Sequence, residues 1–497
     1  MKPSSVFRRK LVSEAESDAE RPGQQLKRSL GSFDLAMLGV GAIIGAGIFS
    51  SVGDTGAVAG PALAISYLMT AVACGFAALC YAEIAAMVPI AGSAYTYSYV
   101  AFGEVIAWII GWDLIIEYAI GNIYVAQSWA DHFQSFLRGA FGVSFPPWMT
   151  TDVQTASSAA FTHYTPTIAG HVIAFNLPAA LITVFITIVL VRGIRESARF
   201  NTGMVVFKLI LLLAFIAIGS FFVEPANWTP FAPHGFHGIW LGASLAFFSY
   251  IGFDAVSTAA EETVNPQRNV PRGMIASLII CTTLYIVVAM VTTGLVPSDQ
   301  LAGGDPLAHA LRAVGLNKAA IVIAFGALIA MTAVLLVFQL GQTRIFMVMA
   351  RDGLLPPVFA RIHPRFRTPH ISTMLTGAGV AILPSFMTQT QALHLTNIGT
   401  LFAFTLVSAG VIALRKIEPD RPRPFKVPLY PLTPLLAMAT CIWLMAGLPS
   451  SNWWRFAVWL LIGLVVYYLY GFRRSRLGHA RHAAAGSAGP AGPAGPP

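Results

Sequence analysis

Charged residues are scarce in this 497-residue chain. Aspartate, glutamate, lysine and arginine together make up 11% of it, whereas soluble domains carry about 25%. Apolar residues make up 56%, and the mean hydropathy is +0.68. This composition excludes an ordinary soluble domain and predicts an all-α polytopic membrane protein, because a chain in lipid must pair its own backbone N–H and C=O groups. We expect twelve transmembrane helices, near residues 33–58, 62–87, 105–130, 171–191, 202–223, 240–260, 273–295, 319–346, 371–387, 394–414, 433–448 and 453–472.

Cysteine is rare, and the motifs of common enzymes are missing. The four cysteines, Cys74, Cys80, Cys281 and Cys441, lie in or beside predicted spans without CxxC spacing. They indicate small core residues and exclude a disulfide framework or a metal site. The chain also has no Gly-rich phosphate loop, GxSxG or HExxH motif. We therefore expect no enzyme, no catalytic residue, no cofactor, no metal and no ATP site.

Positive charge is almost missing from one side of the predicted membrane. With the N-terminus in the cytoplasm, the inner segments hold 26 of the 31 lysines and arginines, and the outer loops hold only Arg138, Arg312, Lys318 and Arg455. Lys208 lies inside a span. This asymmetry predicts that both termini are cytoplasmic. It also explains the net charge of +9, so a nucleic-acid partner is not needed to account for that charge. The basic inner rim is expected to attract the anionic headgroups of the lipid bilayer.

Two of the apolar stretches are interrupted by glycine at their centres. The first interruption is GVGAIIGAGIF (39–49) in span 1, and the second is FFSYIGFDAV (247–256) in span 6. Glycines at this spacing also occur where unbroken helices pack closely. Their recurrence at matching places in two halves favours broken helices, and paired broken helices indicate the substrate site of a secondary transporter.

The positions of the breaks predict an internal repeat. Spans 1–5 and 6–10 each begin with an interrupted helix, and because five is odd, the second set starts from the opposite membrane face. We expect an inverted five-plus-five repeat followed by helices 11 and 12. The predicted units are a cytoplasmic tail (1–30), the first repeat (31–223), the second repeat (224–432), helices 11–12 (433–474) and a disordered tail (475–497).

Five ionisable residues lie within predicted spans, where charge is costly and indicates function: Glu83, Asp113, Glu117, Lys208 and Asp254. Glu117 lies near the membrane midplane and shares a helix face with Asp113. Asp254 either caps the second half of span 6 or faces a pocket. Lys208 either forms a permanent pair with a carboxylate or gains and loses a proton as a coupling ion, because a lysine removed from water can release its proton.

The stretch PIAGSAYTYSYVAFG (89–103) between spans 2 and 3 is rich in tyrosine and has no lysine or arginine. It predicts a short helix along the inner face. Tyr95 and its neighbours either anchor this helix at the interface or form a gate that closes the inner vestibule.

Several segments together resemble a known family: GVGAIIGAGIF (39–49), AGSAYTYSYVAFGE (91–104), GWDLIIEYAIG (111–121), FFSYIGFDAVSTAAEETVNPQRNVPRG (247–273) and GQTRIFMVMARDGLLP (341–356). They resemble the amino acid–polyamine–organocation (APC) superfamily, and within it the bacterial branch of the cationic amino acid transporters. The resemblance covers about residues 30–475 and implies a LeuT-like inverted repeat with broken helices 1 and 6.

The resemblance also implies a substrate site. Backbone N–H groups at Ala46, Gly47 and Ile48 would hold the amino acid's carboxylate, since a helix N-terminus attracts anions. Freed carbonyls on spans 1 and 6 would hold its ammonium group. The full expected set is Ile43, Gly45, Ala46, Gly47, Ile48, Phe248, Ser249 and Ile251. Many relatives have threonine or serine in place of Ala46, which removes a hydroxyl donor here.

Proton coupling is a further implication of the resemblance. Lys208 matches a lysine that the family's bacterial members carry on span 5 where related transporters bind sodium. Thr332 on span 8 is its expected neighbour, and Glu117 matches the family's buried glutamate on span 3.

The sequence therefore predicts a secondary active transporter that imports amino acids across the plasma (inner) membrane by proton symport and alternating access. An exchanger of amino acids or amines is the alternative with the same fold. A sensor that binds without transporting is disfavoured by the short tails, and a channel by the absence of a filter sequence. Cationic and small neutral amino acids are both consistent with the residues.

Overall fold

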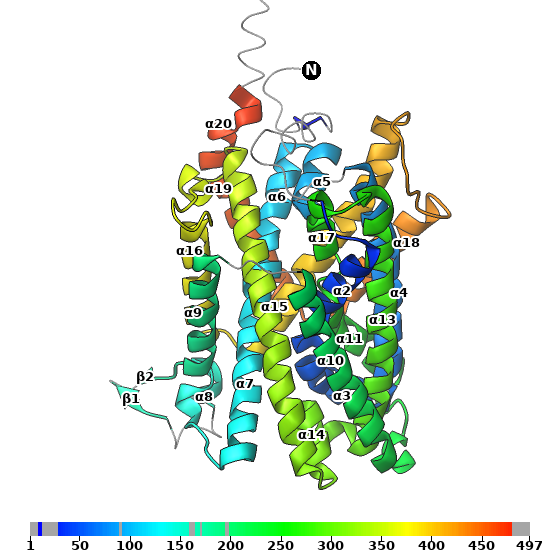
Figure 1. Cartoon of the computed structure of the whole chain (residues 1–497), viewed down its shortest axis with the longest axis vertical. Coiled ribbons are helices and arrows are strands. Elements are labelled where there is room, and N and C mark those ends of the chain that lie inside the picture. Colours follow the sequence, from blue (N-terminus) through cyan, green and yellow to red (C-terminus); the bar gives the residue numbers. More distant parts are fainter. Residues whose placement is uncertain are drawn as a thin grey trace, which may run out of the picture.

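The computed structural model describes residues 8–11, 28–88, 92–158, 165–168, 171–193 and 198–479. Most of the predicted N-terminal tail and the predicted disordered tail from residue 480 onward lie outside these residues. The described chain is mainly helical, and its helices stand side by side along one long axis (Figure 1).

The first half of the chain contains these helices and strands: α2 (Ser32–Ile43), η1 (Gly47–Ser51), α3 (Val52–Ala59), α4 (Leu63–Met87), α5 (Ser93–Ala101), α6 (Glu104–Ile115), η3 (Ile116–Ile120), α7 (Gly121–Phe141), α8 (Val153–Ala156), β1 (Thr167–Ile168), β2 (His171–Val172), α9 (Leu177–Arg192) and α10 (Ala198–Gly219). The second half contains α11 (Gly235–Ala246), η8 (Phe247–Tyr250), α12 (Ala255–Thr258), α13 (Pro266–Leu295), α14 (Pro306–Ala313), α15 (Asn317–Arg351), α16 (His370–Ile382), α17 (Gln389–Ile417), α18 (Leu432–Ala446), α19 (Ser450–Val466), η13 (Tyr467–Gly471) and α20 (Phe472–Arg474).

Each of the twelve predicted apolar stretches contains helix in the structure. Among the described residues, eight helical segments are long and apolar enough to cross a membrane, and α2, α9 and α18 are shorter apolar helices. The chain is therefore a multi-pass membrane protein, while the number of twelve crossings stays a prediction. Local signals set several of the boundaries. Asp34 accepts a hydrogen bond from the Gly31 N–H, 2.9 Å away, at the start of α2, as in a capping box.

The start of span 4 differs from the prediction. Residues 171–172, expected to begin a helix, form β2, which pairs antiparallel with β1. Helix α9 begins only after Asn176, whose side chain accepts from the Ala179 N–H at 3.2 Å. An asparagine at this position satisfies a free donor of the first turn, and this cap outweighs the apolar residues before it.

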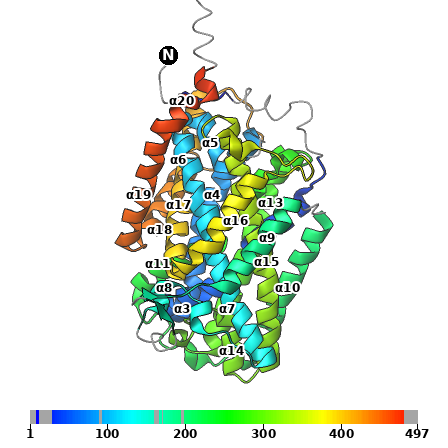
Figure 2. The ribbon, with the colours of Figure 1, turned by 90° about the vertical axis from the view of Figure 1, so that its left-hand side faces the viewer.

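Helices far apart in the sequence pack in a regular way. Helix α4 packs on α13, α7 on α15, and α9 on α16, and η1 touches η8. Figure 2 shows α9 beside α16. In the predicted numbering, these are spans 2 with 7, 3 with 8, 4 with 9, and 1 with 6. An inverted repeat produces this pairing, which supports the predicted repeat boundaries without fixing them.

Spans 1 and 6 run in opposite directions. The Leu30 N–H, just before α2, donates to the Glu262 carbonyl beyond α12, at 3.0 Å. At the other end, the His234 ring nitrogen before α11 lies 3.0 Å from the Val58 carbonyl in α3. Helices α5 and α20 lie at one end of the molecule, and α14, α8 and the two strands lie at the other (Figure 1). We call these the terminal end and the distal end.

Candidate functional site

The break in span 1 lies where the glycine run predicts it. Helix α2 ends at Ile43, Ile44 has extended backbone (φ −75°, ψ 103°), and helical structure resumes at Gly47. A break of this kind leaves the last carbonyls of one half-helix and the first N–H groups of the next without helical partners. Gly45 is required by packing, because a Cβ there would overlap Cγ2 of Val334 on α15.

Two side chains from other helices hold the freed carbonyls. The Lys208 ammonium on α10 donates to the carbonyls of Gly41 (2.9 Å) and Ile44 (3.1 Å). The Tyr285 hydroxyl on α13 donates to the Ile43 carbonyl at 3.0 Å. The sequence analysis missed Tyr285, because a single hydroxyl in an apolar span is a weak signal.

Lys208 is fully buried. Among the described residues it forms no ion pair with a carboxylate, so the alternative of a permanent lysine–carboxylate pair does not occur in this structure. In the described part of the chain, its charge is offset only by carbonyl dipoles of the break. The two hydrogen bonds from the ammonium group therefore link the protonation of Lys208 to the conformation of the span 1 break.

The break in span 6 also lies where predicted. After η8, Ile251 is extended (φ −60°, ψ 132°), and Gly252 has a φ of +118°. Only glycine adopts such a φ without strain. A Cβ at Gly252 would also lie 3.0 Å from the carbonyl atoms of Ala42 on α2. Gly252 therefore permits both the sharp turn and the close approach of the two broken helices.

The two breaks face each other in contact. A Cβ on Gly47 would overlap the Cα of Ser249. The Ser249 hydroxyl lies 2.9 Å from that of Ser51 and 3.5 Å from that of Tyr67. Ser51 and Tyr67 were not predicted. The eight predicted substrate-site residues all lie on these two facing segments and are all buried.

An aromatic pair borders the breaks. The ring of Phe248 packs edge-to-face on that of Tyr124 on α7, with 4.5 Å between centroids. The Tyr124 hydroxyl is buried and makes no hydrogen bond to any residue in the described part of the chain. The sequence analysis did not single out Tyr124. It adds a polar group to an otherwise apolar wall beside the span 6 break.

Three carboxyl groups gather beside the breaks. Glu117 lies in η3, a π-helical turn within span 3, and such turns are frequent at functional sites. Glu117 interacts electrostatically with Asp254 and Asp113, and all three are buried. Both oxygens of Asp113, both of Asp254, and Oε1 of Glu117 lack hydrogen-bond partners within the described ranges. The structure thus brings Asp254 of span 6 close to Glu117 and Asp113, the two acidic residues predicted to share a face of span 3.

The two roles considered for Asp254, a cap of α12 or a carboxyl that faces a pocket, both stay predictions. Asp254 is the residue before α12, but its side chain makes no capping hydrogen bond to that helix. Its carboxyl belongs to the acidic group with Glu117.

Thr332, the expected neighbour of Lys208, makes two hydrogen bonds through its hydroxyl. Its hydroxyl donates to the Leu328 carbonyl at 2.7 Å and accepts from the Trp129 indole N–H on α7 at 3.1 Å. Lys208 is not among these hydrogen-bond partners. Val334, which faces the span 1 break, lies two residues further along α15 and points about 200° away from Thr332. That Thr332 lines the surroundings of Lys208 stays a prediction.

Tyr95 lies apart from the breaks, on the predicted short helix α5 at the terminal end. Its hydroxyl donates to Oδ2 of Asp352, just beyond α15, at 2.7 Å. On the same helix, the hydroxyl of Ser93 lies 3.5 Å from that of Ser257 on α12. Helix α5 therefore covers the second half of span 6 from the terminal end.

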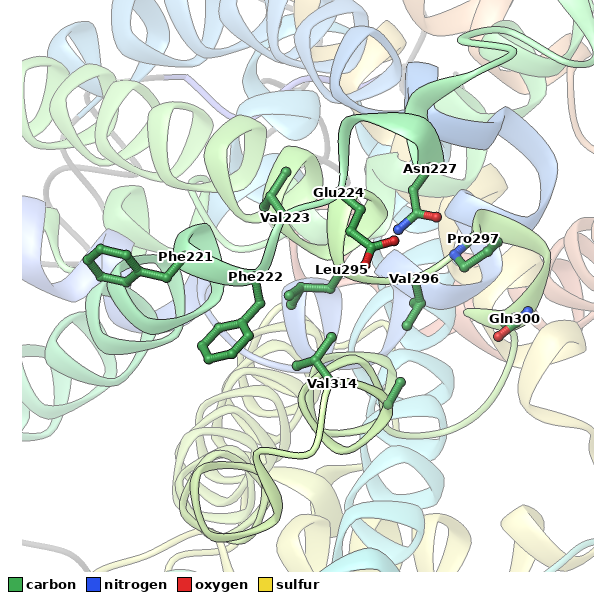
Figure 3. Close-up of a pocket in the computed structure, with 11 residues that line it drawn as sticks. Phe221, Phe222, Val223, Glu224, Asn227, Leu295, Val296, Pro297, Gln300 and Val314 are labelled. Carbon is green, nitrogen blue, oxygen red and sulfur yellow. The ribbon is translucent and has the colours of Figure 1, made fainter.

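A surface pocket of about 740 Å³ lies at the distal end, away from the breaks. It is lined by the segment after α10, the end of α13 with the segment that follows it, and the end of α14 with the residue after it. Figure 3 shows Glu224 beside Asn227, with Val296 and Pro297 close by. No residue predicted for the site lies in this pocket.

Comparison with known proteins fits this geometry. Residues 30–467 match the family model described as amino acid permease. The chain belongs to the amino acid permease family. This permease is therefore a transporter and not an enzyme.

Individual relatives extend the comparison. This permease is 46% identical to the branched-chain amino acid permease BcaP of Bacillus subtilis, over 95% of this chain and 99% of the relative. It is 44% identical to the methylthioribose transporter of the same organism, with the same coverage. The cationic amino acid transporter 9, chloroplastic, of Arabidopsis thaliana is 39% identical over 79% of this chain and 67% of the relative. The predicted membership of the APC superfamily, with its resemblance to cationic amino acid transporters, is confirmed.

Proposed function

We propose that this permease imports amino acids across the plasma (inner) membrane by proton symport, with both termini in the cytoplasm. The contact between the two helix breaks carries this proposal. The start of one half-helix lies beside the end of another inside a membrane protein, and half-helix ends leave N–H and C=O groups without helical partners. A zwitterion is the ligand that both sets of groups can bind at once.

The substrate's carboxylate binds the backbone N–H groups of Ala46, Gly47 and Ile48. A half-helix start carries free donors and partial positive charge. The ammonium group binds the carbonyls of the facing segments, from Ile43 on span 1 and from Phe248, Ser249 and Ile251 on span 6. Because this recognition uses the main chain, it reads the part that all amino acids share. Gly45 allows the break itself to form.

Lys208 couples this site to protons. When charged, its ammonium group donates to two carbonyls of the span 1 break. When it releases its proton toward the cytoplasm, that attraction weakens, because hydrogen bonds to charged groups are roughly twice as strong as neutral ones. The break then rearranges and the substrate leaves. Glu117, the centre of the acidic group, is the second proton-binding residue that we propose.

Accumulation in proteoliposomes tests the proposal. The vesicles contain no internal amino acid, are acidic outside, and receive radiolabelled amino acids one at a time. Proton symport predicts accumulation above the external concentration, which disappears when a protonophore collapses the gradient. An exchanger would accumulate label only after the vesicles are loaded with internal amino acid, and that outcome would overturn symport while leaving the transport of amino acids in place.

A further inference from the structure

Glu104 is a buried carboxylate that collects donors from distant parts of the chain. The Arg8 guanidinium contacts it through two nitrogens, Nε to Oε2 at 2.9 Å and Nη2 to Oε1 at 2.7 Å. The hydroxyls of Tyr99 (2.9 Å) and Tyr467 (3.0 Å) also donate to it, as does that of Ser475. Both members of the ion pair are buried. One carboxylate thus joins the N-terminal segment, α5, span 3 and the segment after span 12.

The N-terminal segment makes a second set of contacts at the same end. Lys10 lies 3.3 Å from Oδ1 of Asp352, the residue after span 8. Asp352 also accepts from the Tyr95 hydroxyl on α5, and its carbonyl accepts from the Arg476 N–H at 3.0 Å. We call residues 8–11 the strap. The strap is therefore bonded to Glu104 at the start of span 3 and to Asp352 after span 8, and Arg8 also donates to the Phe472 carbonyl at the end of span 12, at 3.5 Å. It is joined to α5 through these two carboxylates, which also accept from tyrosine hydroxyls of α5.

Helix α5 connects the strap to the candidate site. It packs on α17 and on α12, and Ser93 contacts Ser257 of α12. Helix α12 is the half of span 6 that follows the break. The chain that leads into span 1 is also joined to the end of span 6, through Leu30 and Thr263. Movement of either broken helix at the terminal end therefore requires movement relative to α5 and the strap.

Arg8 keeps its charge despite burial. Burial alone disfavours the charged form of Arg8, but the hydrogen bonds and negative charge of Glu104 outweigh this, and the pKa of Arg8 is raised. Removing two charged groups from water is costly, and a buried ion pair offsets this cost only when its hydrogen bonds have good geometry. The pair of Arg8 and Glu104 can separate without leaving a charge in lipid, because it lies at the end of the helices, where water has access once the strap lifts.

We infer that the strap is a latch on the inner gate of this permease: Arg8, bound to Glu104, holds α5 over the second half of span 6 and must release before substrate passes to the cytoplasm. This inference rests on the proposed transport function and orientation. Arg8 and Glu104 are positioning residues, since in the described part of the chain neither contacts the breaks. The planar guanidinium fork matches a carboxylate at two points, so lysine replaces arginine only in part.

Accessibility of position 257 tests the latch. In a variant whose four buried cysteines are alanine, Ser257→Cys reports whether the space under α5 is open. A membrane-impermeant maleimide is applied to the cytoplasmic face of inside-out vesicles. We expect Arg8→Ala, and deletion of residues 1–10, to raise the labelling rate on the order of tenfold by shifting the gate equilibrium. Arg8→Lys should give a smaller increase. In proteoliposomes, Arg8→Ala should raise the KM for external substrate, because fewer carriers face outward.

The matched control is Arg415→Ala. Arg415 forms a second ion pair at the terminal end, with the buried Glu83 at 2.6 Å, and is itself partly exposed. Within the described ranges no hydrogen bond or ion pair joins either residue to the strap. Unchanged labelling in Arg8→Ala and in the deletion variant would overturn the latch, as would an equal increase in Arg415→Ala. Uptake separates the two proposals. If the unmodified protein transports no amino acid but the strap variants still expose the thiol introduced by Ser257→Cys, the transport function fails and the latch stands.

Discussion

At the scale of single residues, Gly47 makes the most specific prediction. A side chain here meets the backbone of Ser249, which cannot move without disturbing the second break. We expect Gly47→Leu to weaken amino acid binding by at least about tenfold, which corresponds to about 1.4 kcal/mol. Thermal-shift titration with amino acids measures this. Gly75→Leu is the control, because a Cβ at Gly75 meets nothing within 4 Å. Unchanged affinity in a folded Gly47→Leu protein would contradict the proposed carboxylate site.

Lys208 makes a second prediction at this scale. In Lys208→Ala, no ammonium group remains to bind the carbonyls of Gly41 and Ile44, so we expect uptake to lose its dependence on a pH gradient. In the unmodified protein, uptake should rise as the external pH falls, because external protons charge the lysine before the gate closes. The measurement compares uptake with acidic and with neutral external buffer. Lys318→Ala removes an exposed lysine and should behave as the unmodified protein. Full proton-driven accumulation in Lys208→Ala would exclude this lysine as the coupling group.

At the scale of elements, the turn between η8 and α12 depends on Gly252. Alanine at a φ of +118° is strained by about 1–2 kcal/mol, and its Cβ would press on the carbonyl of Ala42. We expect Gly252→Ala to lower the apparent melting temperature and to reduce transport. Gly379→Ala in α16 is the matched control: it has a helical φ and open space around the Cβ position, so it should be neutral or slightly stabilising. Equal stability of the two variants would show that the turn is not under this constraint.

Elements also show what the sequence could and could not predict. The apolar runs and glycines are local signals, and they predicted the helices, both breaks and the short helix α5. The partners of the breaks are not local. Tyr285 reaches Ile43 from a helix more than two hundred residues later in the chain, and Ser51 meets Ser249 across the two breaks. The resemblance identifies Thr332 by its position on a helix, which does not fix the rotation of that helix, and its hydroxyl bonds to Leu328 and Trp129. For Asp254, the pattern left a cap or a pocket open, and its carboxyl lies near two acidic residues of span 3, which no local signal of span 6 could predict.

At the scale of the whole molecule, the positions of lysine and arginine determine the expected orientation, and cysteine labelling tests it. The predicted inner segments carry most of these residues, so we expect the terminal end to face the cytoplasm. In a variant without native cysteines, Ser157→Cys places a thiol on an exposed residue between α7 and α9, towards the distal end, and Arg365→Cys places one on an exposed residue between α15 and α16. An impermeant maleimide added to intact cells should label the Ser157→Cys protein at once and the Arg365→Cys protein only after the membrane is permeabilised. The reverse labelling pattern would show that the membrane orientation is opposite to the expected one. The strap would then face outward and could not serve as a latch on the inner gate. Lys208 would also have to release its proton on the side of the membrane opposite to the one that we propose.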